Sequence, residues 1–257
     1  MRSRLIGTVL LLLTAGAAHG NWVSVYQTDF STDPGWTTNN PASFHWNPAD
    51  GTYYIKMENV NYGGYYSHYN VGHHGGSFKL DYDIRMPYGG YASGMRLGMF
   101  DSDMETEFEG SYVDTLFCTE DRGRTIMIES INSGDVLTPE WSASLHWNLN
   151  TWYDVSMEYF DSTGSFTTTI RDGITGDLVG SKSIHAGPFS TDMSYIGSTN
   201  LRLGTFQVPG AYSIAYIDNV EFYDWEAAPV PVPGAVLLGA LGLGFAGFLG
   251  RRKAFQE

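Results

Sequence analysis

The feature that most limits how this chain can fold is a regular alternation of apolar and polar side chains. In SFKLDYDIRM, residues 77–86, every second residue is apolar and the residues between them are charged. Successive side chains of a β-strand point to opposite faces, so this pattern predicts a strand with one buried face. The same period occurs in TWYDVSMEYF, residues 151–160, and in SFTTTIRDG, residues 165–173. No segment between residues 21 and 225 sustains an apolar period of 3.6, so the sequence predicts an all-β, antiparallel sandwich.

Glycine-containing turn signals separate the predicted strands, as expected for many short strands joined by tight turns. They are Asp50-Gly51, Gly63-Gly64, Gly75-Gly76, Gly89-Gly90, Ser133-Gly134 and Asp172-Gly173. A chain of 257 residues without internal repeats is consistent with one domain plus targeting segments. We place that domain at residues 21–226.

The first twenty residues have the layout of a secretory signal peptide. Arg2 and Arg4 precede an apolar run, 5–13, which is followed by small residues ending at Gly20. The apolar run is too short to span a bilayer. The sequence therefore predicts export of the domain.

The C-terminal end predicts a membrane anchor. A proline-rich linker, 227–233, precedes an uncharged stretch of 17 residues, 234–250, which is long enough to cross a membrane as a helix. A basic tail, 251–257, follows at once, and positive charge favours the cytoplasmic side. We therefore expect residues 21–226 to lie outside the membrane.

The order of these three parts resembles the PEP-CTERM type of sorting signal, found on exported proteins of bacteria that produce biofilm and exopolysaccharide. The resemblance rests on the motif Val230, Pro231, Val232, Pro233 and on the basic cluster Arg251, Arg252, Lys253. Val232 stands where the family usually has a glutamate. The resemblance implies recognition and cleavage by an exosortase-like membrane enzyme, followed by display at the cell surface or release. The alternative is a membrane anchor that is not processed.

Charge and cysteine content exclude some functions. Residues 21–225 contain 9 basic and 26 acidic side chains, a net charge of −17, which repels nucleic acid and favours divalent cations. Cys118 is the only cysteine, so the chain forms no internal disulfide. It lies in an expected strand, DTLFCTE, and we predict a buried thiol.

Four segments together resemble the concanavalin A-like jelly roll, the laminin G-like, lectin and glucanase fold. They are Asp29-Phe30, WNLNTWYDVSMEYFD, FTTTIRDGITGDLVG and AYSIAYIDNVEFYD. The resemblance covers most of residues 21–225. It implies a jelly-roll sandwich but not one activity, because such folds host lectins, glycoside hydrolases, lyases and adhesive modules.

The most acidic stretch, FDSDMETEFEG, carries carboxylates at odd positions from Asp101 to Glu109. On a strand they would line one face about 6.6 Å apart. It resembles the Glu-x-Asp-x-Glu strand of laminarinase-like hydrolases, although neither register of the run matches that motif fully. A solvated strand edge, a cation site and a pair of catalytic carboxylates are three interpretations of this run.

A calcium site is a separate hypothesis. We expect Asp218 to share one side of a strand with Ile214, Tyr216, Val220 and Phe222, where a carboxylate must be neutralised, hydrogen-bonded or bound to a metal. In related carbohydrate-binding jelly rolls the first and last strands supply oxygen ligands to a structural calcium ion. The resemblance implies Asp29 and Asp218 as the counterparts. The alternative is that Asp218 accepts backbone hydrogen bonds.

Tyrosines concentrate in two glycine-rich segments, YGGYYSHYNVGHHGG and PYGGYASG. Rigid rings between flexible glycines can be offered to a sugar face or to another protein, or they can fold back over the sandwich. We name as candidate carbohydrate-binding residues Tyr65, Tyr66, Tyr69, Tyr88 and Tyr91. Trp147 and Trp152 are predicted to be core residues.

No nucleophile elbow or phosphate-binding loop is present in the sequence. The sequence favours an exported surface module that binds or organises extracellular polysaccharide without catalysis. A jelly-roll glycoside hydrolase or polysaccharide lyase, and a purely structural surface protein, are the alternatives.

Overall fold

The computed structural model describes residues 20–58, 65–90, 93–101, 111–120, 123–131, 145–189, 192–199 and 212–226. None of these residues lies in a helix, and they form two antiparallel sheets. The alternation therefore predicted the fold class correctly. No helix of the length and apolarity needed to cross a membrane occurs among the described residues. The expected signal peptide, linker, anchor and basic tail lie outside the described residues.

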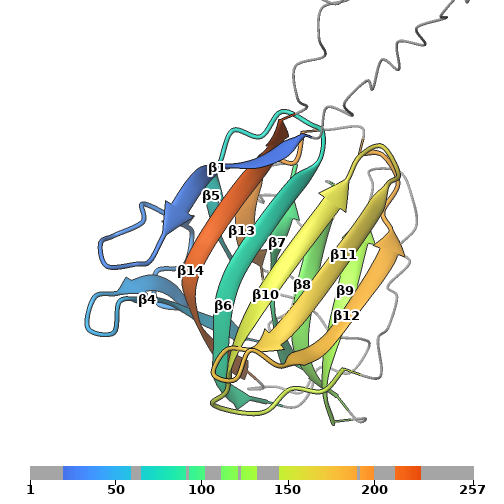
Figure 1. The fold of residues 1–257 in the computed structure, drawn as a ribbon. Coiled ribbons are helices and arrows are strands. Elements are labelled where there is room, and N and C mark those ends of the chain that lie inside the picture. The colour runs from blue at the N-terminus through green and yellow to red at the C-terminus, as the bar shows by residue number, and fades with distance from the viewer. Residues whose placement is uncertain are drawn as a thin grey trace, which may run out of the picture. The chain divides into compact units, whose positions relative to one another are not determined.

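The eight-stranded sheet, which we call sheet A, has the strand order β12-β11-β10-β6-β14-β4-β3, with β1 also paired to β14. Figure 1 shows sheet A in front of the other sheet, with β1 and β4 on the same side of β14. The strands of sheet A are β1 (Asn21–Thr28), β3 (Phe44–Asn47), β4 (Thr52–Glu58), β6 (Phe78–Gly89), β10 (Trp152–Phe160), β11 (Ser165–Asp172), β12 (Leu178–His185) and β14 (Tyr212–Glu226).

The six-stranded sheet, sheet B, has the order β2-β5-β13-β7-β8-β9. Its strands are β2 (Thr37–Thr38), β5 (Tyr66–Asn70), β7 (Ser93–Phe100), β8 (Tyr112–Glu120), β9 (Gly123–Ile131) and β13 (Tyr195–Thr199). Neighbouring strands are often distant in sequence, as expected for a jelly roll.

One apolar core fills the space between the sheets. The predicted inner face of β6 is confirmed, since its even-numbered apolar residues from Phe78 to Met86 are at most 2% exposed. They meet side chains of β7 and β9, including Leu97 and Ile128, in a single cluster. Large rings dominate this core because each removes much apolar surface from water.

Trp147 is a core residue as predicted, 2% exposed, and its Nε1 donates a hydrogen bond to the Cys118 carbonyl oxygen. The prediction for Trp152 is wrong. It begins β10 on the outer face and is only half-buried, because the alternation that sends Tyr153 into the core sends its neighbour outward. The Cys118 thiol is buried, as predicted.

The last strand contains a bulge that the sequence did not predict. Asn219 adopts a φ of 50°, and the pairing of β14 with β6 shifts between Asp218 and Glu221. Ala215 and Ile217 face the core before the bulge, and Val220 and Phe222 face it afterwards. The expectation that Asp218 shares a face with Val220 and Phe222 is therefore wrong, since the extra residue reverses the alternation.

Candidate functional site

The outer face of sheet A carries a line of charged side chains from four neighbouring strands. Asp154 of β10 lies opposite Asp83 of β6, and Asp83 lies opposite Asp218 of β14. We call these three residues the carboxylate row. Arg171 of β11 lies opposite Asp154 and ends the row with a positive charge. Directly opposed cross-strand side chains are close enough to interact strongly.

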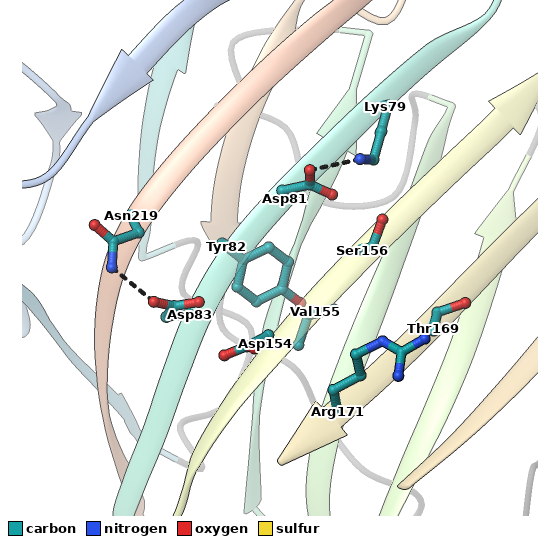
Figure 2. Close-up of a pocket in the computed structure, with 10 residues that line it drawn as sticks. All are labelled: Lys79, Asp81, Tyr82, Asp83, Asp154, Val155, Ser156, Thr169, Arg171 and Asn219. Atoms are coloured by element: carbon teal, nitrogen blue, oxygen red, sulfur yellow. Dashed lines mark hydrogen bonds and ion pairs between the residues drawn. The ribbon is translucent and has the colours of Figure 1, made fainter. Parts of the chain in front are cut away.

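A pocket of about 330 Å³ opens on this face of sheet A. Figure 2 shows Asp83 and Asp154 pointing toward each other in the middle of it, with Arg171 on one side and Asn219 on the other. The Nδ2 group of Asn219 donates a hydrogen bond to Asp83 at 2.7 Å, and Lys79 forms an ion pair with Asp81 at 2.7 Å. The lining residues are Lys79, Asp81, Tyr82, Asp83, Asp154, Val155, Ser156, Thr169, Arg171 and Asn219.

The electrostatics of the carboxylate row centre on Asp83. The pKa of Asp83 is raised from 3.8 to about 6. Partial burial is the largest cause of the rise, the Asn219 hydrogen bond opposes it, and the neighbouring charges of Asp154 and Asp218 add to it. Asp83 therefore titrates closer to neutral pH than an ordinary aspartate does.

Aromatic rings form a second line beside the carboxylate row, two residues further along the strands. Arg85 of β6 pairs with Trp152 of β10 and with Tyr216 of β14, and Tyr216 pairs with Tyr54 of β4 and so with His45 of β3. We call these five residues the aromatic ladder. His45 is exposed and the other four are half-buried.

The members of the aromatic ladder contact each other in sequence. The Arg85 guanidinium lies 5.1 Å from the ring centroids of both Trp152 and Tyr216. The Tyr216 and Tyr54 centroids are 5.7 Å apart, and those of Tyr54 and His45 are 4.7 Å apart. Cation–π and aromatic contacts of this kind hold the rings in place on the sheet.

A separate aromatic cluster lies near the other end of the outer face. Trp225 of β14 is 38% exposed and contacts Trp22 of β1 at 4.9 Å and Phe160 of β10 at 6.2 Å between centroids. These rings come from the ends of their strands, away from Trp152 at the start of β10. Trp225 is thus an exposed tryptophan outside the aromatic ladder.

The structure does not bring the predicted tyrosines into one platform. Tyr66 is 9% exposed and packs with Phe100 and Tyr112 on sheet B. Tyr69 stacks on Tyr26 at 4.3 Å and, like Tyr65, packs against the main core. Their rings meet partners that are distant in sequence and fold back over the sandwich, which was the alternative interpretation.

Tyr88 differs from the other candidates, since it is 45% exposed and stacks on Tyr212 at 4.7 Å beside the aromatic ladder. Lys56 lies 5.0 Å from the Tyr212 centroid. Tyr91 lies outside the described residues. Of the four predicted tyrosines that the structure describes, Tyr88 is the exposed ring on the outer face of sheet A.

The proposed metal ligands Asp29 and Asp218 lie in the same part of the fold, after the end of β1 and at the bulge of β14. Asp29 follows the end of β1, and a pocket of about 290 Å³ is lined by Asp29, Asn219, Glu221 and neighbouring residues. Partial burial raises the pKa of Asp218, and the charge of Asp29 raises it further. The Asp218 carboxylate also accepts a hydrogen bond from the Asn219 backbone N–H at 2.8 Å, as the alternative interpretation expected.

Asp29 itself accepts hydrogen bonds from the Ser31 hydroxyl and backbone N–H, which lower its pKa. The described part of the chain contains no group of three or more His, Cys, Asp or Glu side chains placed to hold a metal ion. Any calcium ion at this position would need backbone carbonyl oxygens or water to complete its six to eight ligands.

The outer face of sheet B contains a buried ion pair. Arg96 of β7 is 2% exposed, and its Nε donates to the fully buried Asp114 of β8 at 2.8 Å. A second guanidinium nitrogen bonds the same carboxylate oxygen. The Arg96 guanidinium also lies 4.4 Å from the Tyr112 ring centroid. Both guanidinium bonds go to Asp114 Oδ2, while Oδ1 is buried without a hydrogen-bond partner among the described residues. The pair is closed to solvent, so we assign it a structural role.

Two other predicted features fall mainly or wholly on undescribed residues. In the acidic run only Asp101 is described, and its carboxylate accepts a hydrogen bond from the Ser111 backbone N–H at 2.8 Å. The sorting motif, 230–233, and the basic cluster, 251–253, lie outside the described residues. These predictions stay predictions.

The two stacked sheets form a jelly-roll sandwich whose fold is similar to that of lectins and carbohydrate-binding modules. The similar solved structures include basic winged bean lectin with Tn-antigen, 11% identical with a TM-score of 0.54, covering 80% of this chain and 99% of the lectin. They include a structure from work on endo-acting O-glycanases of the human gut microbiota, 11% identical, TM-score 0.55, covering 79% of this chain and all of that chain.

The CBM2 module of an evolved Dit protein of Lactobacillus casei BL23 phage J-1 is also similar, with 13% identity, a TM-score of 0.51, and coverage of 80% of this chain and 97% of that chain. At these identities the likeness establishes the fold alone. No protein-family model and no curated protein matches the sequence.

Sequence reasoning missed the aromatic ladder and the carboxylate row. Their members come from five strands whose order in sheet A does not follow the sequence. The alternation marks Asp83, Arg85, Trp152 and Asp154 as outward-facing. It gives no cross-strand register for strands that are distant in sequence.

Proposed function

We propose that the outer face of sheet A binds polysaccharide without catalysis. The observation that carries the proposal is the aromatic ladder lying beside the polar pocket. Sugars are recognised by flat rings that cover their C–H faces and by polar groups that bond their hydroxyls. Both are present here, the rings in Trp152, Tyr216 and Tyr54 and the polar groups in Asp83, Asp154 and Asn219.

The similar folds support the proposal by analogy only. One similar structure holds a lectin with a carbohydrate antigen, and another is a carbohydrate-binding module. Jelly rolls host many functions, so carbohydrate binding has to be argued from the residues of the site. On this chain those residues are the aromatic ladder and the lining of the pocket.

A glycoside hydrolase is the second candidate, favoured by the raised pKa of Asp83. A carboxyl with a pKa of about 6 suits a general acid. However, Asp83 and Asp154 lie directly opposite each other and point toward each other (Figure 2), whereas glycosidase carboxyls flank a substrate that lies between them. We therefore favour binding over hydrolysis, and over a structural role without a sugar ligand.

We also propose that a signal peptide exports the domain and that a PEP-CTERM-like signal sorts it. The support comes from the arrangement of residues 1–20 and 227–257 in the sequence. An exosortase-like enzyme would then process the membrane-anchored chain and leave the domain on the cell surface or in the extracellular matrix.

A structural calcium ion between Asp29 and Asp218 is part of the same proposal. The charge of Asp29 acts on Asp218, and Asp29 lines a pocket together with Gln27, Thr28 and Glu221, whose side chains all carry oxygen atoms. Oxygen-rich sites of this kind suit calcium. The ion would join the end of β1 to the bulge of β14.

A glycan array followed by an activity assay tests the proposed function. The purified domain, 21–226, is expected to bind at least one polysaccharide, and the double variant Trp152→Ala/Tyr216→Ala is expected to lose that binding. Trp225→Ala, an exposed tryptophan outside the aromatic ladder, serves as the matched control and should bind normally.

A reducing-sugar assay on every bound glycan then separates binding from hydrolysis. No release of reducing ends is expected. Turnover that disappears in Asp83→Asn would show that the domain is a glycoside hydrolase. A domain that binds no glycan would favour the purely structural role.

A further inference from the structure

The aromatic ladder crosses five strands in one continuous line, from Trp152 of β10 to His45 of β3. Four strand spacings of about 4.8 Å give it a length of about 19 Å. A single sugar ring covers only part of that length. The ladder therefore has room for several consecutive sugars.

The ladder is open at both described ends. At one end His45 is exposed and belongs to β3, the last strand in the order of sheet A. At the other end, the Trp152 carbonyl oxygen accepts a hydrogen bond from Gly173 at 2.8 Å, and glycine has no side chain to close the line. A site that recognises a chain terminus encloses it, whereas an open line lets the polymer continue in both directions.

The charge beside the ladder limits which sugars fit. The carboxylate row runs parallel to the ladder, two residues and about 6.6 Å away along the strands. Partial burial of Asp83 strengthens the repulsion that its carboxylate exerts on another anion, and Asp154 and Asp218 add their charges beside it. Uronic acids and other acidic sugars on the ladder would meet this repulsion.

We infer that the aromatic ladder binds an internal stretch of an extended, non-acidic polysaccharide lying across the strands. This inference rests on the proposed function and specifies its ligand class. Trp152, Tyr216, Tyr54 and His45 provide successive contacts along the polymer, and Asp154, Asp83 and Asp218 exclude acidic chains.

Calorimetry with oligosaccharides of increasing length tests the inference. The probes are neutral series of glucose and N-acetylglucosamine oligomers from the monosaccharide to the hexasaccharide, with oligogalacturonates of the same lengths as the acidic comparison. For at least one neutral series we expect affinity to rise with each added sugar until the ladder is filled. Acidic oligomers should bind more weakly at every length.

Variants at the two ends of the ladder add a spatial test. His45→Ala and Trp152→Ala are each expected to weaken hexasaccharide binding about three- to tenfold, the worth of one aromatic contact. Trp225→Ala should leave it unchanged. Trp152→Phe keeps an aromatic ring and should retain most of the affinity, which separates lost contact from lost folding.

The outcomes distinguish this inference from the proposed function. A monosaccharide that binds as tightly as the hexasaccharide would overturn the extended site and leave carbohydrate binding intact. Equal affinity for acidic oligomers would overturn the exclusion by the carboxylate row. Failure of all neutral and acidic probes, including the polymers, would remove both proposals.

Discussion

Asp83 of β6 lies directly opposite Asp154 of β10, and partial burial together with the charge of Asp154 raises the pKa of Asp83. Two adjacent carboxylates on the outer face of a sheet repel each other unless one of them holds a proton. The pair therefore makes both the stability and the ligand preference of this face depend on pH.

Asp83→Asn is expected to stabilise the domain more at pH 7 than at pH 4.5. The folded-state pKa of Asp83 is about 6, above its ordinary 3.8, so the folded protein binds this proton more tightly than the unfolded chain does. Stability from this group is thus present at low pH and is lost as pH rises through about 6. Allowing for solvent screening, the difference is on the order of 1 kcal/mol. Urea unfolding at both pH values measures it, and a pH-independent effect would contradict the assignment.

Arg96→Met is expected to destabilise the domain by about 3–5 kcal/mol, because it leaves the fully buried Asp114 without its partner. The double variant Arg96→Met/Asp114→Ala removes both charges and should recover much of this loss. Urea unfolding curves of the two variants provide the measurement. If the double variant is as unstable as the sum of the single ones, the two charges are not coupled as described.

Calcium is expected to raise the melting temperature of the domain, and chelation with EDTA should reverse the rise. In Asp29→Asn/Asp218→Asn the effect should disappear, because both proposed carboxylate ligands are gone. Asp177→Asn, an exposed carboxylate before β12, is the matched control. A melting temperature that changes with neither calcium nor EDTA would exclude a calcium site at Asp29 and Asp218.

Gly98→Ala is expected to cost at least about 1–3 kcal/mol of stability, the usual cost of overpacking. A Cβ at Gly98 would lie 2.1 Å from the Val113 carbonyl oxygen and 2.6 Å from the Asp114 Cα, and both are backbone atoms that cannot turn away. Ser156→Ala on the outer face of sheet A is the control and should change stability by less than about 0.5 kcal/mol. Thermal unfolding compares the two.

The mature protein isolated from its native cells is expected to lack residues 251–257, since the sorting signal implies cleavage near Val230 to Pro233. Mass spectrometry of the C-terminal peptide checks this directly. An intact chain ending at Glu257 in the membrane fraction would support the unprocessed anchor instead.

The sequence predicted the sandwich well where local alternation decides the structure. The inward and outward faces of β6, β10 and β11 follow the two-residue period. Burial of Phe78 or Ile170 needs only the presence of a partner sheet, whichever strand supplies it.

The candidate site was less predictable because it depends on register between strands that are distant in sequence. His45 and Trp152 belong to one line on sheet A, although more than a hundred residues separate them. Tyr66 and Tyr69 looked free in a glycine-rich segment, but Phe100, Tyr112 and Tyr26 cover them. These contacts are tertiary, and a single sequence does not encode them locally.

Asn219 is an extra residue in β14, and the bulge at this residue decides which side chains after it face the core. Deleting it would leave Val220 and Phe222 facing the core in regular alternation with Ile217, whereas a regular strand that kept Asn219 without the bulge would turn both residues toward solvent. The burial of the second half of β14 therefore depends on the backbone conformation of one residue more than on the chemistry of the side chains around it.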